Sequence, residues 1–158
     1  MPQENKHTKS FAIIFWILTA ICMGAIFYFS SRPAMQSAGQ SSVVTLFLQR
    51  LFHTEAITEH MVRKAAHFTE FTGLGLLTNS AVYFTKHKCN LAIGIAIGSA
   101  YAATDEIHQI FVDGRSCQFT DWALDTLGVI TGALIFLILY LIIRKIIEHK
   151  NDKRFKEI

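Results

Sequence analysis

The sequence has 158 residues, of which 51% are hydrophobic and 17% charged, and its formal net charge at pH 7 is +3. Soluble domains carry about 25% charged residues, so the composition argues against a soluble domain or a disordered chain, and the small net charge does not indicate nucleic-acid binding. The three cysteines are too few and too scattered for a disulfide framework or a zinc site, and the class that remains is a small integral membrane protein.

The first predicted helix covers residues 11–30. Residues 11–29 are nineteen consecutive residues without a charge, and a membrane-spanning helix needs about 20 apolar residues. The run is longer than the apolar core of a secretory signal, which has about 7–15 residues, and the segment 30–33 makes a poor cleavage site. We therefore expect a retained transmembrane helix.

The loop that follows contains a predicted amphipathic helix. Its apolar residues follow the spacing i, i+3, i+4, i+7, at Val44, Phe47, Leu48 and Leu51. Two placements are open for this helix. It can lie flat in the outer headgroup layer, or it can pack across the mouth of a helical bundle.

The remaining predicted spans are 64–85, 91–112 and 121–143. The last contains eighteen uncharged residues in a row, whereas the two middle segments reach spanning length only with ionisable residues included. We therefore predict an all-α, polytopic membrane protein with four transmembrane helices and an amphipathic helix in the first outer loop. A soluble helical bundle is the alternative, and it is disfavoured because two such long uncharged runs are rare in a small soluble fold.

The distribution of basic residues predicts the orientation. Ten Lys and Arg residues lie in the N-terminal segment, the loop 86–90 and the tail, against five on the other side of the predicted membrane. The positive-inside rule then places both termini in the cytoplasm of a multi-pass cell-membrane protein. The predicted organisation is a cytoplasmic segment 1–10, a membrane domain 11–143 and a basic cytoplasmic tail 144–158.

This topology brings the ionisable residues of three helices to one depth, at the outer end of the bundle. Ionisable side chains in a membrane cost at least about 2.5–3.5 kcal/mol each at the bilayer centre and persist where they pair or line a wet cavity. Spacings of four and three residues put members of each group on one helix face. The predicted ligand-binding residues are Arg63, Lys64, His67, Glu70, Asp105, Glu106, Gln109, Arg115, Asp121 and Asp125.

The chemistry of this cluster is open at the level of sequence. The candidate acids and bases are His67, Glu70, Asp105, Glu106, Asp121 and Asp125, but no residue is singled out as a nucleophile. No spacing is diagnostic of a metal, so no metal ligand and no cofactor is assigned. The structural alternative is an ion-pair network that locks the helix ends. Below the cluster, GxxxG spacings at 94–98 and 128–132 predict close helix packing.

Three ordered motifs in this region resemble the VanZ-like family. They are the basic-x-x-His-Phe-x-Glu-aromatic motif at 63–71, the Asp-Glu-x-x-Gln-x-Phe…Gly-Arg signature at 105–115, and the closing Asp-x-x-x-Asp-x-x-Gly element at 121–128. The first helix, ending in Phe29-Ser30-Ser31, also looks typical. The chain departs from the family at two positions, with Phe71 where Tyr is frequent and Asp125 where Asn is common.

The resemblance implies a role at the cell surface, because the family is named for low-level resistance to teicoplanin, a lipid-tailed glycopeptide that binds cell-wall precursors. The first hypothesis is an outward-facing pocket that binds or modifies a lipid-linked or phosphate-bearing envelope component. The alternative is a non-catalytic protein that limits antibiotic access, with transport ranked last. The expected partners are membrane lipids and a lipid-linked cell-wall precursor or lipoglycopeptide, without nucleic acid, and the sequence assigns no oligomeric state.

Overall fold

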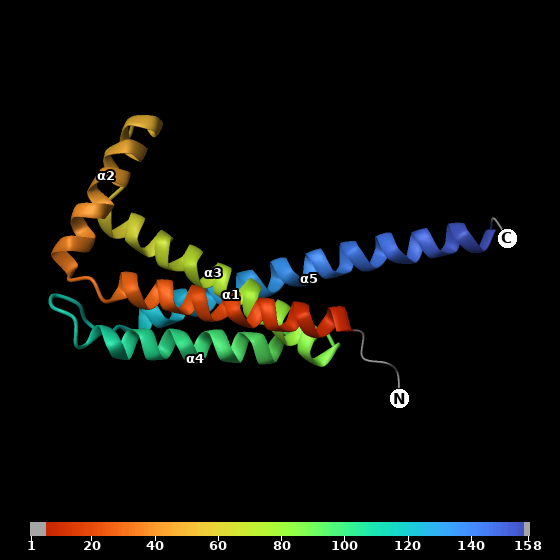
Figure 1. Cartoon of the computed structure of the whole chain (residues 1–158). Coiled ribbons are helices and arrows are strands. Elements are labelled where there is room, and N and C mark those ends of the chain that lie inside the picture. The colour runs from red at the N-terminus through yellow and green to blue at the C-terminus, as the bar shows by residue number, and fades with distance from the viewer. Residues whose placement is uncertain (1–5, 157–158) are drawn as a thin grey trace.

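Helices make up most of residues 6–156, the part of the chain that the computed structural model describes (Figure 1). The five helices of this part are α1 (Lys6–Ser30), α2 (Ala34–Phe52), α3 (Glu59–Lys86), α4 (Leu91–Gln109) and α5 (Phe119–Lys156). No strand occurs between residues 6 and 156, which confirms the all-α prediction. Residues 1–5 and 157–158, at the ends of the predicted cytoplasmic segment and tail, lie outside the described residues.

Helix α3 is the centre of the molecule and contacts each of the other four helices. Figure 1 shows α1, α3, α4 and the first part of α5 side by side, with the rest of α5 continuing beyond the bundle. The core between them is formed by Ile26, Phe71, Leu74, Ala102 and Val129, whose side chains are almost fully buried. A small apolar core of this kind fixes the helix ends at which the polar residues meet.

Glycines allow α3 and α5 to pack with their backbones in contact. A Cβ atom added at Gly132 would lie 2.1 Å from the carbonyl oxygen of Thr72, and one added at Gly75 would lie 2.2 Å from that of Val129. At Gly128 the corresponding distance to the Phe68 oxygen is 2.7 Å. The close packing predicted from the GxxxG spacing at 128–132 is therefore present, between α5 and α3.

Replacing Gly132 by alanine is expected to destabilise the fold, because the new methyl group would overlap a backbone oxygen. Overpacking of this kind costs about 1–3 kcal/mol. The matched control is Gly73→Ala, since nothing lies within 4 Å of a Cβ atom at Gly73 and alanine favours a helix over glycine by about 0.5–1 kcal/mol. Thermal unfolding in detergent should show a lower Tm for the first variant only, and equal Tm values would contradict the close α3–α5 packing.

Two helices, α1 and α5, contain segments long and apolar enough to cross a membrane, namely Thr8–Ser30 and Phe119–Lys153. Within the described residues, α3 and α4 do not meet the same criterion; both carry acidic residues near one end. The four-span topology therefore stays a prediction for these two helices. Helix α5 has 38 residues, or about 57 Å at a rise of 1.5 Å per residue, so it exceeds the predicted span 121–143 and runs on through the basic tail.

The predicted helix 91–112 is too long at its C-terminal end. Helix α4 ends at Gln109, and the chain then turns through three successive i→i−3 hydrogen bonds, from the amides of Ile110, Phe111 and Val112. Gly114 completes the turn with a φ of 74°, a conformation that glycine adopts without a steric penalty. Helix α3 begins earlier than the predicted residue 64, because the Thr58 side chain accepts a hydrogen bond from the Met61 amide and caps it.

The amphipathic helix of the first loop is present as α2, and it extends crosswise from one end of the bundle (Figure 1). Val44, Phe47 and Leu51 on its predicted apolar face are exposed. Most of this face is therefore not covered by the bundle, although Val44 also lines a groove with α1 and α3, and its placement in the outer headgroup layer stays a prediction.

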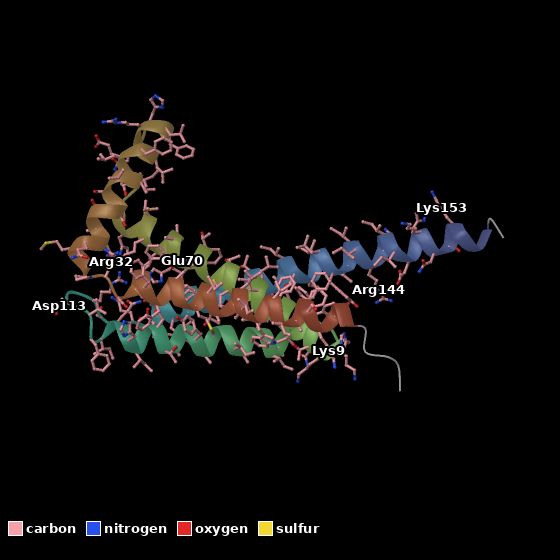
Figure 2. All side chains as sticks on the ribbon, viewed as in Figure 1. Lys9, Arg32, Glu70, Asp113, Arg144 and Lys153 are labelled. Atoms are coloured by element: carbon pink, nitrogen blue, oxygen red, sulfur yellow. The ribbon has the colours of Figure 1, made fainter. Side chains whose placement is uncertain are left out.

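The two ends of the bundle differ in charge. Figure 2 shows Lys9, Arg144 and Lys153 toward one end of the molecule, and Arg32 and Asp113 at the other. The basic residues predicted to face the cytoplasm thus gather away from the end at which α2 and the loop between α4 and α5 lie. The orientation relative to the membrane stays a prediction.

Candidate functional site

Polar side chains from three helices and one loop line a pocket at the end of the bundle where α4 finishes and α3 and α5 begin. This charged pocket has a volume of about 170 Å³. Eight of the ten predicted ligand-binding residues line it: Arg63, Lys64, His67, Glu106, Gln109, Arg115, Asp121 and Asp125. Residues that are far apart in the sequence meet here because neighbouring helices run in opposite directions. The start of α3, the end of α4 and the start of α5 therefore lie at the same end of the bundle.

Asp105 lies beside the pocket rather than in its lining, and its side chain is 2% exposed. Its Oδ2 atom accepts hydrogen bonds from Ser30 Oγ at 2.8 Å and from Gln109 Nε2 at 3.1 Å. Its Oδ1 atom is buried and has no hydrogen-bond partner. Asp105 is thus held in a fixed orientation by one oxygen, while the other oxygen is bare.

Asp125 and His67 complete a group with Asp105. Asp125 is 1% exposed, and its Oδ2 atom also lacks a hydrogen-bond partner. His67 Nδ1 lies 3.8 Å from that oxygen, beyond hydrogen-bond distance. Each of the three side chains offers a nitrogen or oxygen atom, and these atoms all lie within 4.8 Å of one another.

The three cations of the pocket have different surroundings. Lys64 Nζ donates to Asp121 Oδ1 at 2.6 Å, and both side chains are about one-third exposed, at 32% and 28%. Arg63 donates to His60 Nδ1 at 3.2 Å and has no carboxylate within ion-pair distance among the described residues. Arg63 is therefore the cation most available to an anion.

Arg115 donates hydrogen bonds to the chain segment that joins α1 and α2, at the end of the bundle. Its Nε atom donates to the carbonyl oxygen of Arg32 at 3.0 Å, and its Nη2 atom donates to Ser37 Oγ at 2.7 Å and to the Phe29 oxygen at 3.4 Å. Burial, and the neighbouring charge of Arg63 after it, lower the pKa of Arg115 from its ordinary value. An arginine remains charged after such a shift. Arg115 thus fastens the loop between α4 and α5 to the ends of α1 and α2.

A second pocket adjoins the first and differs from it in polarity. Its volume is about 250 Å³, and apolar side chains from α1, α2 and α3 form much of its lining, at Phe29, Val44, Val62 and Ala66. Glu70 lines this apolar groove and not the charged pocket. Arg63, His67 and Arg115 line both cavities. The expectation that all candidate residues share one pocket is therefore incomplete for Glu70 and Asp105.

The ion-pair network proposed as a structural alternative is not what the described residues form. Within the cluster, Lys64–Asp121 is the single pair between a Lys or Arg and a carboxylate in this part of the chain. Glu106 instead accepts a hydrogen bond from the Gln118 amide at 2.9 Å. Asp105 and Asp125 have no Lys or Arg within 4.0 Å among the described residues, and the one cationic partner near them is His67, 3.8 Å from Asp125, which pairs with it only when protonated.

The structure adds residues to the site that the sequence did not single out. Ser30, the last residue of α1, is fully buried against Asp105, and His60 and Gln118 line the charged pocket. In the sequence, Ser30 stood out only as part of the first helix end, Phe29-Ser30-Ser31, which resembles the family's. His108, also on α4, does not line the charged pocket. Its Nε2 atom lies 3.0 Å from Ser31 Oγ, and its ring centroid lies 4.4 Å from that of Phe27.

Comparison with known proteins connects this geometry to a family. The family model described as VanZ/LLP1 matches residues 15–140, which include every residue of the charged pocket. The match covers most of the chain and confirms the resemblance carried by the three motifs. No curated protein and no solved structure matches the chain at a significant level.

Proposed function

Because this chain belongs to the VanZ/LLP1 family, we propose that its charged pocket faces outward and binds or modifies a lipid-linked, phosphate-bearing component of the cell envelope. Family membership and the two apolar helices make it a membrane protein. The multi-pass topology with cytoplasmic termini, and the division into segment 1–10, domain 11–143 and tail 144–158, are part of the same proposal.

The observation that carries the proposal is the junction of two cavities of opposite character. The charged pocket offers Arg63, Lys64 and Arg115, and the adjoining groove offers apolar side chains from α1, α2 and α3. A lipid with a phosphate-bearing head group likewise joins an anionic part, which would suit the charged pocket, to an apolar tail, which would suit the groove. Arg63 stands where the cavities meet, and a guanidinium can bind phosphate oxygens in bidentate fashion.

Two roles are compatible with such a ligand. Glu106, Asp121, Asp125 and His67 line the charged pocket and are groups suited to acid–base work in hydrolysis or transfer of a phosphoryl or glycosyl group. Binding without chemistry would also mask a precursor or alter the surface, and so lower the access of a glycopeptide. Either role supports the proposed contribution to low-level glycopeptide resistance. The unpaired state of Asp105 and Asp125 favours a binding or reaction site over a purely structural cluster.

The test is to identify the lipid that the protein retains. Full-length protein is extracted in mild detergent from cells exposed to sub-inhibitory teicoplanin, and bound lipids are measured by mass spectrometry. We expect a phosphate-bearing lipid to co-purify with the wild type and to be lost from Arg63→Ala. Arg144→Ala is the matched control, because Arg144 is exposed and lies toward the opposite end of the molecule (Figure 2).

Equal retention by both variants, or retention of bulk lipids alone, would contradict the proposal. A comparison of envelope lipids in cells with and without the protein separates the two roles. A new or depleted lipid that depends on Asp105 supports a reaction, whereas unchanged lipids with altered teicoplanin binding support recognition alone.

The proposed orientation makes a separate prediction for two cysteines. Cys89 follows α3 and Cys117 precedes α5, and both side chains are exposed. An impermeant thiol reagent added to intact cells should modify Cys117 and leave Cys89 unmodified, because the loop between α4 and α5 is proposed to face outward. Permeabilised cells provide the control in which both react. Modification of Cys89 alone in intact cells would invert the topology.

A further inference from the structure

Two buried carboxylates at the wall of the charged pocket each have an oxygen that nothing in the described chain satisfies. These atoms are Asp105 Oδ1 and Asp125 Oδ2. A buried polar atom without a partner costs about 1–3 kcal/mol, and more when it is charged. Two neighbouring carboxylates in an apolar surrounding also repel each other unless a positive charge or a proton lies between them. No Lys or Arg of the described residues lies within 4.0 Å of either one.

The distances within this group suit a metal ion. The ligand atoms of His67, Asp105 and Asp125 lie within 4.8 Å of one another, and His67 Nδ1 is 3.8 Å from Asp125 Oδ2. Two ligands of a tetrahedral ion, each about 2.1 Å from it, are about 3.4 Å apart, so the observed separations exceed those of a closed site by about 1 Å or less for the His67–Asp125 pair and by up to about 1.4 Å for the group. Small side-chain rotations therefore suffice to close the three groups around one ion.

The surroundings of Asp105 have the arrangement expected of a metal ligand. Ser30 and Gln109 both donate to Oδ2, so they fix the carboxylate and leave Oδ1 without a competing partner. Ligating carboxylates in metal sites are commonly held by hydrogen bonds of this kind. The ring of His67 packs nearly parallel to that of Phe71, with centroids 6.5 Å apart, which restricts the orientation of the imidazole.

We propose that His67, Asp105 and Asp125 bind one divalent metal ion at the wall of the charged pocket. Imidazole suits Zn²⁺ and carboxylates suit Mn²⁺, so these two ions match the mixed donor set best. Three protein ligands leave positions for water or a ligand oxygen. His67 and Asp125 also line the pocket with Arg63, so a phosphate held by Arg63 would share the pocket with the ion.

This metal site deepens the proposed function, but it is tested without any lipid. Full-length protein with a histidine-free affinity tag is stripped with EDTA in detergent and titrated with Zn²⁺ by calorimetry and with Mn²⁺ by electron paramagnetic resonance. We expect one equivalent of ion per wild-type chain. Asp105→Asn and Asp125→Asn should each lower the affinity at least about tenfold, since losing even an outer hydrogen-bond partner costs 10–100-fold.

Asp113→Asn is the matched control, because Asp113 is an exposed carboxylate of the neighbouring loop that lines neither cavity (Figure 2). The ion should raise the Tm of the wild type and of this control, and not that of the triad variants. His67→Gln gives a third ligand variant, with an uncharged side chain, if an aspartate variant fails to fold.

Unchanged stoichiometry and affinity in the triad variants would overturn the proposal, since the ion would then bind elsewhere. Failure of the wild type to bind either ion would overturn it as well. Lipid retention is measured separately by mass spectrometry. A metal-free protein that still retains its lipid in an Arg63-dependent way would refute the metal site and leave the proposed function standing.

Discussion

Asp105→Asn is expected to abolish the proposed resistance phenotype while leaving the metal-free protein as stable as the wild type, or more stable. The reason lies in what surrounds the carboxylate. No Lys or Arg of the described residues pairs with it, so the substitution leaves no cation unsatisfied. The amide oxygen of asparagine can still accept the hydrogen bonds of Ser30 and Gln109. Its NH₂ group can donate toward the bare oxygen of Asp125, and one negative charge is removed.

The measurements are thermal unfolding in detergent with EDTA and teicoplanin susceptibility of cells with matched protein levels. If Asp105 belonged to a structural ion pair, its loss would cost about 3–5 kcal/mol, as for other broken buried pairs. A stable variant without the phenotype is the pattern of a site that trades stability for function. Joint loss of stability and phenotype would identify Asp105 as a structural residue and contradict the proposed site.

Ala66→Trp is expected to remove the long-chain lipid while leaving the charged pocket open. Ala66 lines the apolar groove but not the charged pocket, so an indole there would occupy the space proposed for the lipid tail. Overpacking costs about 1–3 kcal/mol, and 1.4 kcal/mol corresponds to a tenfold change in affinity. Lipid retention measured by mass spectrometry should therefore fall about tenfold or more.

Ala65→Trp is the matched control, because Ala65 is an exposed neighbour on the same helix that lines neither cavity. Retention by this control should equal that of the wild type, and metal binding should be unchanged in both variants. Loss of lipid from both variants would mean that a bulky residue anywhere on this part of α3 disturbs the protein. Retention by both would remove the groove from the proposed function.

The predicted helices were placed most accurately where a long uncharged run determined them. The run 11–29 predicted the end of α1, which is at Ser30 as expected, whereas α1 begins at Lys6, five residues before the predicted start. The start of α3 and the end of α4 were less accurate, because they depend on a cap at Thr58 and a turn through Gly114 that lie outside the apolar runs. The C-terminal end of α5 was missed for a different reason. A helix can continue through charged residues once it has left the membrane, and hydropathy then gives no sign of where it stops.

The sequence also predicted that the candidate site residues of three helices share one end of the molecule. Helix direction alternates from one span to the next, so the start of α3, the end of α4 and the start of α5 had to share a level if the runs formed an antiparallel bundle. The shared level is a consequence of chain connectivity. It needs no knowledge of side-chain positions, and eight of the ten predicted residues line one pocket as a result.

By itself, then, the sequence determined the helical class, the family and the end of the bundle at which the polar residues gather. The tertiary structure decided which of them touch. His67, Asp105 and Asp125 come from three different helices, so no spacing along the chain could show that their ligand atoms lie within 4.8 Å. Glu70 lines the apolar groove, and Arg115 donates hydrogen bonds to the backbone oxygens of Arg32 and Phe29. Helix rotation and packing depth set these contacts, and they depend on glycines that bring α5 against α3, from Gly128, one turn from Asp125, to Gly132 and Gly75 deeper in the bundle.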